Sequence, residues 1–88
     1  MKIIDECILG IVRKRYPDAE NDIVALDLYA QDIFKALKAD AQNPNYEKDN
    51  QNFIDVYHIV VELRKDLLNQ AIENESKIIQ NKTEVLNG

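Results

Sequence analysis

The chain is poor in residues that break helices and in residues that build covalent or metal cross-links. Its 88 residues include two glycines, two prolines, one cysteine and one histidine. With so few helix breakers, long uninterrupted helices are expected. A single cysteine, Cys7, makes no internal disulfide and no zinc site, which is typical of a reducing compartment. Neither Gly10 nor Gly88 belongs to a glycine-rich run, so no phosphate-binding loop is recognised.

Long apolar runs are missing as well. No segment approaches eighteen consecutive apolar residues, so the sequence predicts no membrane-spanning helix. The first residues, MKIIDECILGIVRKRYP, lack the order of a secretory signal, because Asp5 and Glu6 interrupt the apolar part and the basic residues follow it. An apolar content of 45% is nevertheless enough for a globular chain. We therefore expect one cytoplasmic domain that spans residues 1–88.

Apolar residues recur at helical spacing in three segments, which predicts an all-α, up-down bundle with helices over residues 2–15, 20–41 and 51–73. Pro17 ends the first helix, and Asp18 or Asn21 caps the second. Asn50 or Asn52 caps the third. The apolar stripes expected to face the core are Ile3, Ile4, Cys7, Ile8, Ile11 and Val12 in the first helix; Ile23, Leu26, Tyr29, Ala30, Ile33, Phe34 and Leu37 in the second; and Phe53, Val56, Tyr57, Val60, Val61, Leu63, Leu67, Leu68, Ala71 and Ile72 in the third.

The apolar spacing continues past residue 73, through Ile78, Ile79, Val85 and Leu86, and no glycine or proline intervenes before Gly88. Two arrangements remain open for residues 74–88. The third helix continues as a C-terminal extension that projects or frays, or a short fourth helix folds back from a turn near Ser76. The helix-forming residues of ENESK favour the extension. A projecting last helix would offer a surface for homodimerisation.

Charge is distributed unevenly along the chain, whose net charge is −5. Residues 1–17 carry a net of +2, residues 18–55 carry nine acidic and three basic side chains, and residues 56–88 carry a net of −1. This distribution argues against nucleic acid as a partner, because phosphate contacts need clustered lysine and arginine. It favours a basic protein partner. The alternative is that the acidic residues only keep a small protein in solution.

The acidic stretch PDAEND resembles the start of a calcium-binding loop, because acids alternate at Asp18, Glu20 and Asp22. Such a loop needs glycine at its sixth position and glutamate at its twelfth. The chain has Ile23 and Tyr29 there, so the calcium interpretation fails. The cluster is better explained as acidic residues in the first turn of a helix.

No arrangement of residues indicates catalysis. His58, the one histidine, shares a helix face with Asp55 and Glu62, so a carboxylate–imidazole pair is geometrically feasible. A di-iron site in a helical bundle needs two Glu-x-x-His units and two further carboxylates, which the chain lacks. No nucleophile or substrate pocket accompanies His58. We expect a structural or surface histidine, and a protein that is not an enzyme and binds no cofactor and no metal.

The segment DAQNPNYEKDNQNF, residues 40–53, is the strongest candidate for a working surface. It is long for a connection between bundle helices, which typically takes about two to eight residues. Tyr46 stands beside Glu47 and Asp49, with Asp40 before and Asp55 after. A tyrosine can anchor an interface at low entropic cost, and the acids would complement basic groups. Alternatively, Tyr46 packs back onto the bundle and the segment is only a connector.

Residues 28–65, LYAQDIFKALKADAQNPNYEKDNQNFIDVYHIVVELRK, resemble the latter half of the small immunity proteins of the colicin D type. The similar elements are the helix ending DIFKALKAD, the NYE followed by Asp49, and a terminal amphipathic helix. The resemblance implies a small helical bundle whose acidic surface plugs the active site of a basic toxin that cleaves transfer RNA. By position it nominates Tyr46, Glu47 and Asp49, with Asp40 and Asp55 at the margins. The first helix shows no match, and the chain extends about twenty residues past the matched helix.

The sequence therefore predicts a bacterial, non-enzymatic inhibitor of the immunity type that occludes a basic protein partner, such as a toxin nuclease. A phage-encoded inhibitor of a bacterial defence nuclease is a variant of the same prediction. An alternative of another class is a structural or adaptor protein that homodimerises through its last helix.

Overall fold

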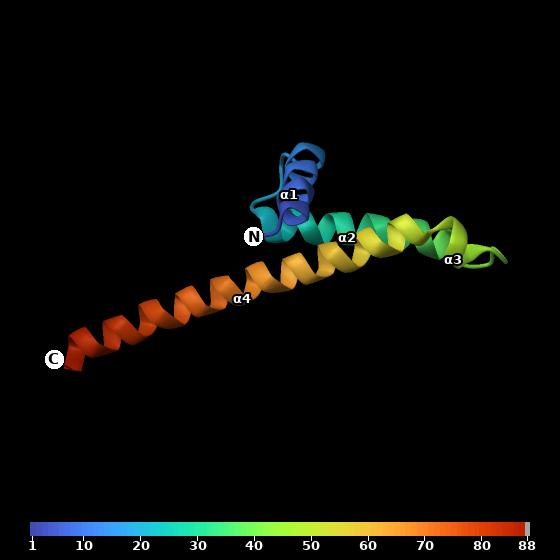
Figure 1. Ribbon diagram of the computed structural model, residues 1–88. Helices are drawn as coiled ribbons and strands as arrows, with labels where there is room; N and C mark the ends of the chain where they lie inside the picture. The colour runs from blue at the N-terminus through green and yellow to red at the C-terminus, as the bar shows by residue number, and fades with distance from the viewer. Residues whose placement is uncertain (88) are drawn as a thin grey trace.

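The chain folds entirely into helices and the turns that connect them, in a computed structural model that describes the backbone of residues 1–87 and the side chains of residues 1–76 (Figure 1). The helices are α1 (Ile3–Arg15), α2 (Asp22–Ala39), α3 (Tyr46–Asp49) and α4 (Gln51–Asn87). The described residues form no strand, which confirms the predicted all-α class. The three predicted helices correspond to α1, α2 and the first part of α4.

The core lies where α2 packs along the first part of α4, with α1 laid across both helices (Figure 1). Two of the buried α2 residues, Ala25 and Ala30, are small, which lets the neighbouring helices approach closely. Burial of this shared apolar surface is the main term that holds the three helices together. The buried apolar residues are Ile8, Leu9 and Val12 of α1, Ala25, Leu26, Ala30, Ile33 and Leu37 of α2, and Val60 and Leu63 of α4.

Local sequence signals set the ends of α1 and α2. The helix α1 ends at Arg15, two residues before Pro17, which disfavours helical backbone in the residue before it. Asn21 caps α2, because its side-chain Oδ1 accepts a hydrogen bond of 3.0 Å from the Val24 amide. Of the two predicted caps, Asn21 is therefore the one that is used.

Helix α4 settles the arrangement that the sequence left open after residue 73. It is continuous over 37 residues, so the C-terminal extension is correct and no fourth helix folds back. At about 1.5 Å per residue it is about 55 Å long, about twice the length of α2. The radius of gyration is 17.7 Å, whereas a compact 88-residue domain has about 12 Å. The far half of α4 therefore extends beyond the core (Figure 1).

Several residues on the predicted apolar stripes are exposed. Cys7, expected in the core, is exposed, while Leu9, absent from the predicted stripe, is buried. The reason is that α1 is covered from one side only, so part of its apolar stripe faces solvent. Phe34 and Phe53 were also expected to face the core, but they are 54% and 53% exposed. Other exposed members of the predicted stripes are Ile3, Ile4, Ile11, Val61, Leu68 and Ile72.

None of the described helices is both long enough and apolar enough to cross a membrane.

Candidate functional site

The acids of α2 are largely engaged by basic side chains from the neighbouring helices. Arg13 of α1 forms a two-pronged bond with Asp22, with Nε donating to Oδ1 at 3.0 Å and Nη2 donating to Oδ2 at 2.7 Å. The hydrogen bond from Arg13 lowers the pKa of Asp22, and the attraction of the two charges adds to this. This pair fastens the end of α1 to the start of α2 across the connecting turn.

A second contact between α1 and α2 is built around Tyr16. Its hydroxyl donates to the Asp32 carboxylate and accepts a hydrogen bond of 3.0 Å from Arg15 Nε. Burial raises the pKa of Tyr16, the bond to Asp32 raises it further, and Arg15 opposes both effects. The Arg15 guanidinium also lies 5.7 Å and 5.8 Å from the ring centres of Tyr16 and Tyr29, a cation–π arrangement.

The remaining acid of α2, Asp27, faces α4. Its Oδ1 lies 3.5 Å from Arg64 Nε, and its Oδ2 accepts a hydrogen bond of 2.9 Å from Gln31. Asp22, Asp27 and Asp32 of α2 thus each lie within 4.0 Å of an arginine from another helix. The acid-rich count for residues 18–55 therefore does not describe one continuous acidic surface.

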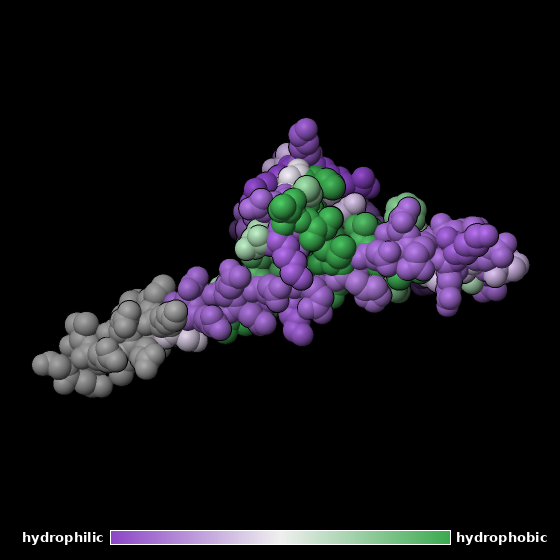
Figure 2. All heavy atoms as spheres, in the orientation of Figure 1, coloured by the Kyte–Doolittle hydropathy of each residue, from purple (hydrophilic) through white to green (hydrophobic). Residues whose placement is uncertain are grey.

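Acids without such cations gather at the turn between α2 and α4, which we call the acidic tip and define as Asp40, Glu47, Asp49 and Asp55. Residues 40–55 contain one basic side chain, Lys48, and carry a net charge of −3. Among the described side chains, none of the four acids of the tip forms an ion pair. In Figure 2 the end of the molecule that carries α3 is covered mainly by hydrophilic residues.

Two asparagine side chains hold two acids of the tip, Asp40 and Asp49, in place. Asn43 Nδ2 lies 3.1 Å from Asp40 Oδ2 and 2.9 Å from Asp49 Oδ2, so one amide bridges two carboxylates. Asn50 is buried, and its Nδ2 donates both to Asp40 and to the backbone oxygen of Tyr46, at 2.9 Å for the latter. These bonds tie the end of α2, the helix α3 and the start of α4 into one unit.

The same amides keep Asp40 ionised. Hydrogen bonds from Asn50 and, to a smaller extent, from Asn43 lower the pKa of Asp40. An amide donor stabilises the carboxylate form but carries no charge of its own. Asp40 is therefore held in place without being neutralised, and this distinguishes it from the acids of α2 that are paired with arginines.

The predicted anchor Tyr46 is half-buried and packs against the edge of the core. Part of the Tyr46 side chain therefore packs back onto the bundle, as the alternative predicted, and the rest lies at the surface. Tyr46 opens α3, and the next residue, Glu47, is exposed. The other predicted acids differ in setting: Asp49 and Asp55 are exposed, with Asp55 Oδ1 accepting a 2.9 Å hydrogen bond from Gln51, whereas Asp40 is half-buried in the amide network.

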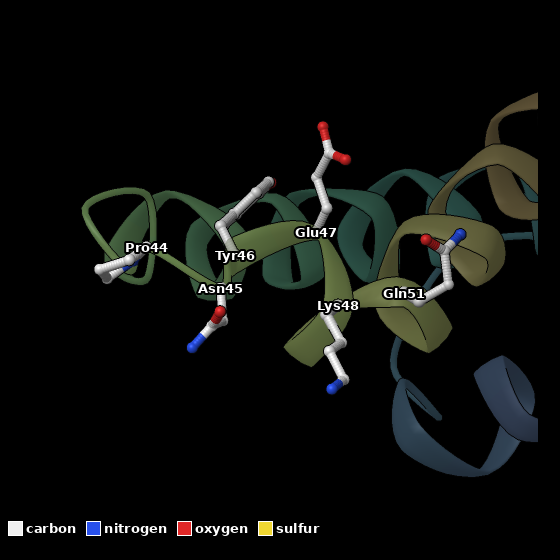
Figure 3. Close-up of a pocket in the computed structure, with 6 residues that line it drawn as sticks. All are labelled: Pro44, Asn45, Tyr46, Glu47, Lys48 and Gln51. Atoms are coloured by element: carbon white, nitrogen blue, oxygen red, sulfur yellow. The ribbon is translucent and has the colours of Figure 1, made fainter.

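A shallow hollow at the tip is lined by Pro44, Asn45, Tyr46, Glu47, Lys48 and Gln51 (Figure 3). Figure 3 shows that the side chains of Glu47 and Lys48 point in opposite directions and that Pro44 lies at the outer end. Because these groups do not converge on one point, they do not form the set of polar contacts that would orient a small molecule. The geometry suits contact with a larger, complementary surface.

Neither His58 nor the acids of the chain form a recognisable chemical centre in the part that the structure describes. His58 is exposed, and its ring packs edge-on to Tyr57, with 6.0 Å between ring centres. Within the described residues, no group of three or more histidine, cysteine or acidic side chains could hold a metal ion.

Sequence reasoning missed Asn43 and Asn50 as the residues that shape the tip. Of the two, only Asn50 had a predicted role, as a cap of the third helix. Asn50 does precede α4, but its side chain turns back toward Asp40 and does not cap the helix. The density of asparagines around Pro44 is the sequence signal that could have suggested such a network.

Comparison with known proteins does not identify this chain. No protein-family model, no curated protein and no solved structure matches it. The resemblance of residues 28–65 to the immunity proteins of the colicin D type therefore stays a prediction.

Proposed function

We propose that the protein is a non-enzymatic inhibitor that binds a basic protein through the acidic tip and occludes its positively charged cleft. The observation that carries the proposal is the concentration of unpaired carboxylates at one end of the molecule. A partner of the toxin-nuclease type fits this chemistry, because its active site is built to receive phosphate groups. Carboxylates presented on a protein surface can take the place of those phosphates.

The order of the tip supports this function. Asp40 and Asp49 are held by Asn43, so binding would not need to immobilise them. Preorganisation of this kind lowers the entropic cost of association. Glu47 and the exposed edge of Tyr46 lie beside them, which adds a charge and an aromatic contact to the same surface.

The tip also lies far from two acids that form no ion pair among the described side chains, Asp18 and Glu20 in the turn between α1 and α2. The tip and these two acids flank opposite ends of α2, which is about 27 Å long at about 1.5 Å per residue. The chain therefore offers a matched control, because two charges can be removed at either end with the same change in net charge.

The experiment is capture on the immobilised protein from a lysate of the source cells, followed by purification of the captured protein and a test of its RNA cleavage. The expected result is a basic protein whose cleavage is abolished by one equivalent of the wild-type chain. The double variant Glu47→Gln, Asp49→Asn should inhibit at least about tenfold less well, and Asp18→Asn, Glu20→Gln should inhibit as wild type does.

Two results contradict the proposal. One is a captured partner without nuclease activity or without a basic surface. The other is equal inhibition by the two double variants, which would mean that only net charge matters and that the tip is not the binding surface.

A further inference from the structure

An apolar groove runs between α2 and α4, away from α1. Its walls include Phe34 of α2 and Tyr57 and Val61 of α4, and the rings of Phe34 and Tyr57 lie 6.3 Å apart, centre to centre. Helix α1 lies over another side of α4, where Ile4 and Asp5 line a hollow with Ile59, Glu62, Leu63 and Asp66. At about 100° per residue, that side of α4 is roughly opposite the groove.

The groove continues as an apolar stripe along the projecting part of α4. Leu68 and Ile72 follow Val61 after seven and eleven residues, spacings that keep all three on one helix face. Val61, Leu68 and Ile72 are 38%, 37% and 54% exposed. An occupant of this surface must therefore be long, because it has to cover both the groove and the stripe.

Charges of both signs line the groove: Asp27, which already lies 3.5 Å from Arg64, and Lys35, which forms no ion pair among the described side chains. Asp27, Gln31 and Lys35 line it at four-residue steps on α2. When two copies of a helix cross in antiparallel directions, a residue before the crossing point meets the residue equally far after it in the other copy. A two-fold axis at Gln31 thus places Asp27 of one copy against Lys35 of the second copy.

The exposed apolar residues of α4 fit an axis in the same part of the groove. Gln31 and Val61 both line the groove, so we take the axis to pass near both residues. With the axis at Val61, Phe53 of one copy lies level with residue 69 of the second copy, beside Leu68. The exposed Phe53 and the exposed Leu68 would then cover each other.

The chain exposes more surface than a compact monomer of its mass. Its total is 6937 Å², whereas a compact monomer of 10.2 kDa exposes about 5,300 Å². This excess belongs to the elongated chain as a whole, and a standard interface takes roughly 800 Å² per partner.

We infer that the groove between α2 and α4 binds a second copy of this chain, in a two-fold symmetric, antiparallel dimer whose axis passes near Gln31 and Val61. The interface is isologous, since the same groove and stripe from each copy meet. This assignment is more specific than pairing through the last helix alone, because α2 as well as α4 lines the groove. It does not depend on the acidic tip or on its partner.

The first test is disulfide trapping of the residue at the axis. In a Cys7→Ser background, Gln31→Cys should give a disulfide-linked dimer with oxidised glutathione, because the two cysteines face each other across the axis. Ala36→Cys is the control, since position 36 is also exposed on the same helix but does not line the groove. Equal trapping at the two positions, or none at position 31, overturns the inference.

The second test measures mass in solution by light scattering. Wild type should have twice the chain mass of 10.2 kDa, and Val61→Lys should dissociate it, with a dimer dissociation constant raised about a hundredfold by two buried lysines. Ile11→Lys, an exposed isoleucine of α1, should remain dimeric. Circular dichroism checks that both variants stay helical. A wild-type monomer at about 1 mM, or a dimer that survives Val61→Lys, overturns the inference.

Discussion

Truncation of Leu26 tests whether the core described above holds the helices together. Leu26 lies near the start of α2, where its side chain is fully buried among α1, α2 and α4. Leu26→Ala would remove most of this side chain while keeping a good helix former, so that the effect reports packing and not helix propensity. The same change at Leu28, which is 37% exposed on the same helix, is a matched control.

The magnitude follows from the difference in burial. A fully buried leucine replaced by alanine loses its transfer free energy and leaves a cavity, for a cost of about 3 kcal/mol. An 88-residue chain has a total stability of about 4–13 kcal/mol, so this loss is a large part of it. Leu28→Ala leaves no closed cavity and should cost about 1 kcal/mol or less.

The assay is urea unfolding followed by circular dichroism, with every variant carrying Val61→Lys so that self-association does not contribute. With a urea dependence of about 1.5 kcal/mol per M, Leu26→Ala should lower the unfolding midpoint by about 2 M and Leu28→Ala by well under 1 M. Similar midpoints for the two variants would refute the assignment of the core to this face of α2.

Two further predictions concern charged groups. The pKa of Asp22 in the folded chain lies below its ordinary value of 3.8, so its pairing with Arg13 stabilises the fold above that pH and is lost as the pH falls through the lowered pKa. Asp22→Asn should therefore have a lower thermal midpoint than wild type at pH 7, and this difference should close toward pH 2. A difference that stays constant with pH contradicts the prediction. Asn50→Asp places a buried carboxylate against Asp40, so the thermal midpoint should fall sharply at pH 7 and recover partly at pH 4, where one of the two acids takes up a proton. A variant as stable as wild type at pH 7 would show that Asn50 does not organise the tip.

The helices were predictable because their signals are local. Few breakers, a cap at Asn21 and a stop at Pro17 are all read within a few residues of the helix end they determine. The continuity of α4 followed in the same way from the absence of glycine and proline before Gly88. Fold class and helix order therefore needed no long-range information.

The surfaces were less predictable because they depend on contacts between distant residues. Periodicity gives the apolar face of α2, but it does not show how far neighbouring helices cover that face, so Phe34 was wrongly expected in the core. The charge count along the chain likewise could not show that Arg13 and Arg64 engage Asp22 and Asp27. The site residues of the tip were nominated from sequence, and their role in binding stays a prediction.

The measurement that tests the central claim most directly is the association rate of the captured basic partner with the chain as a function of ionic strength. If the acidic tip is the binding surface, Glu47→Gln, Asp49→Asn should slow association about tenfold at low salt and flatten the salt dependence. Asp18→Asn, Glu20→Gln should keep the wild-type rate and slope. A tip variant that associates like wild type, or a control variant that is slowed equally, would contradict the account.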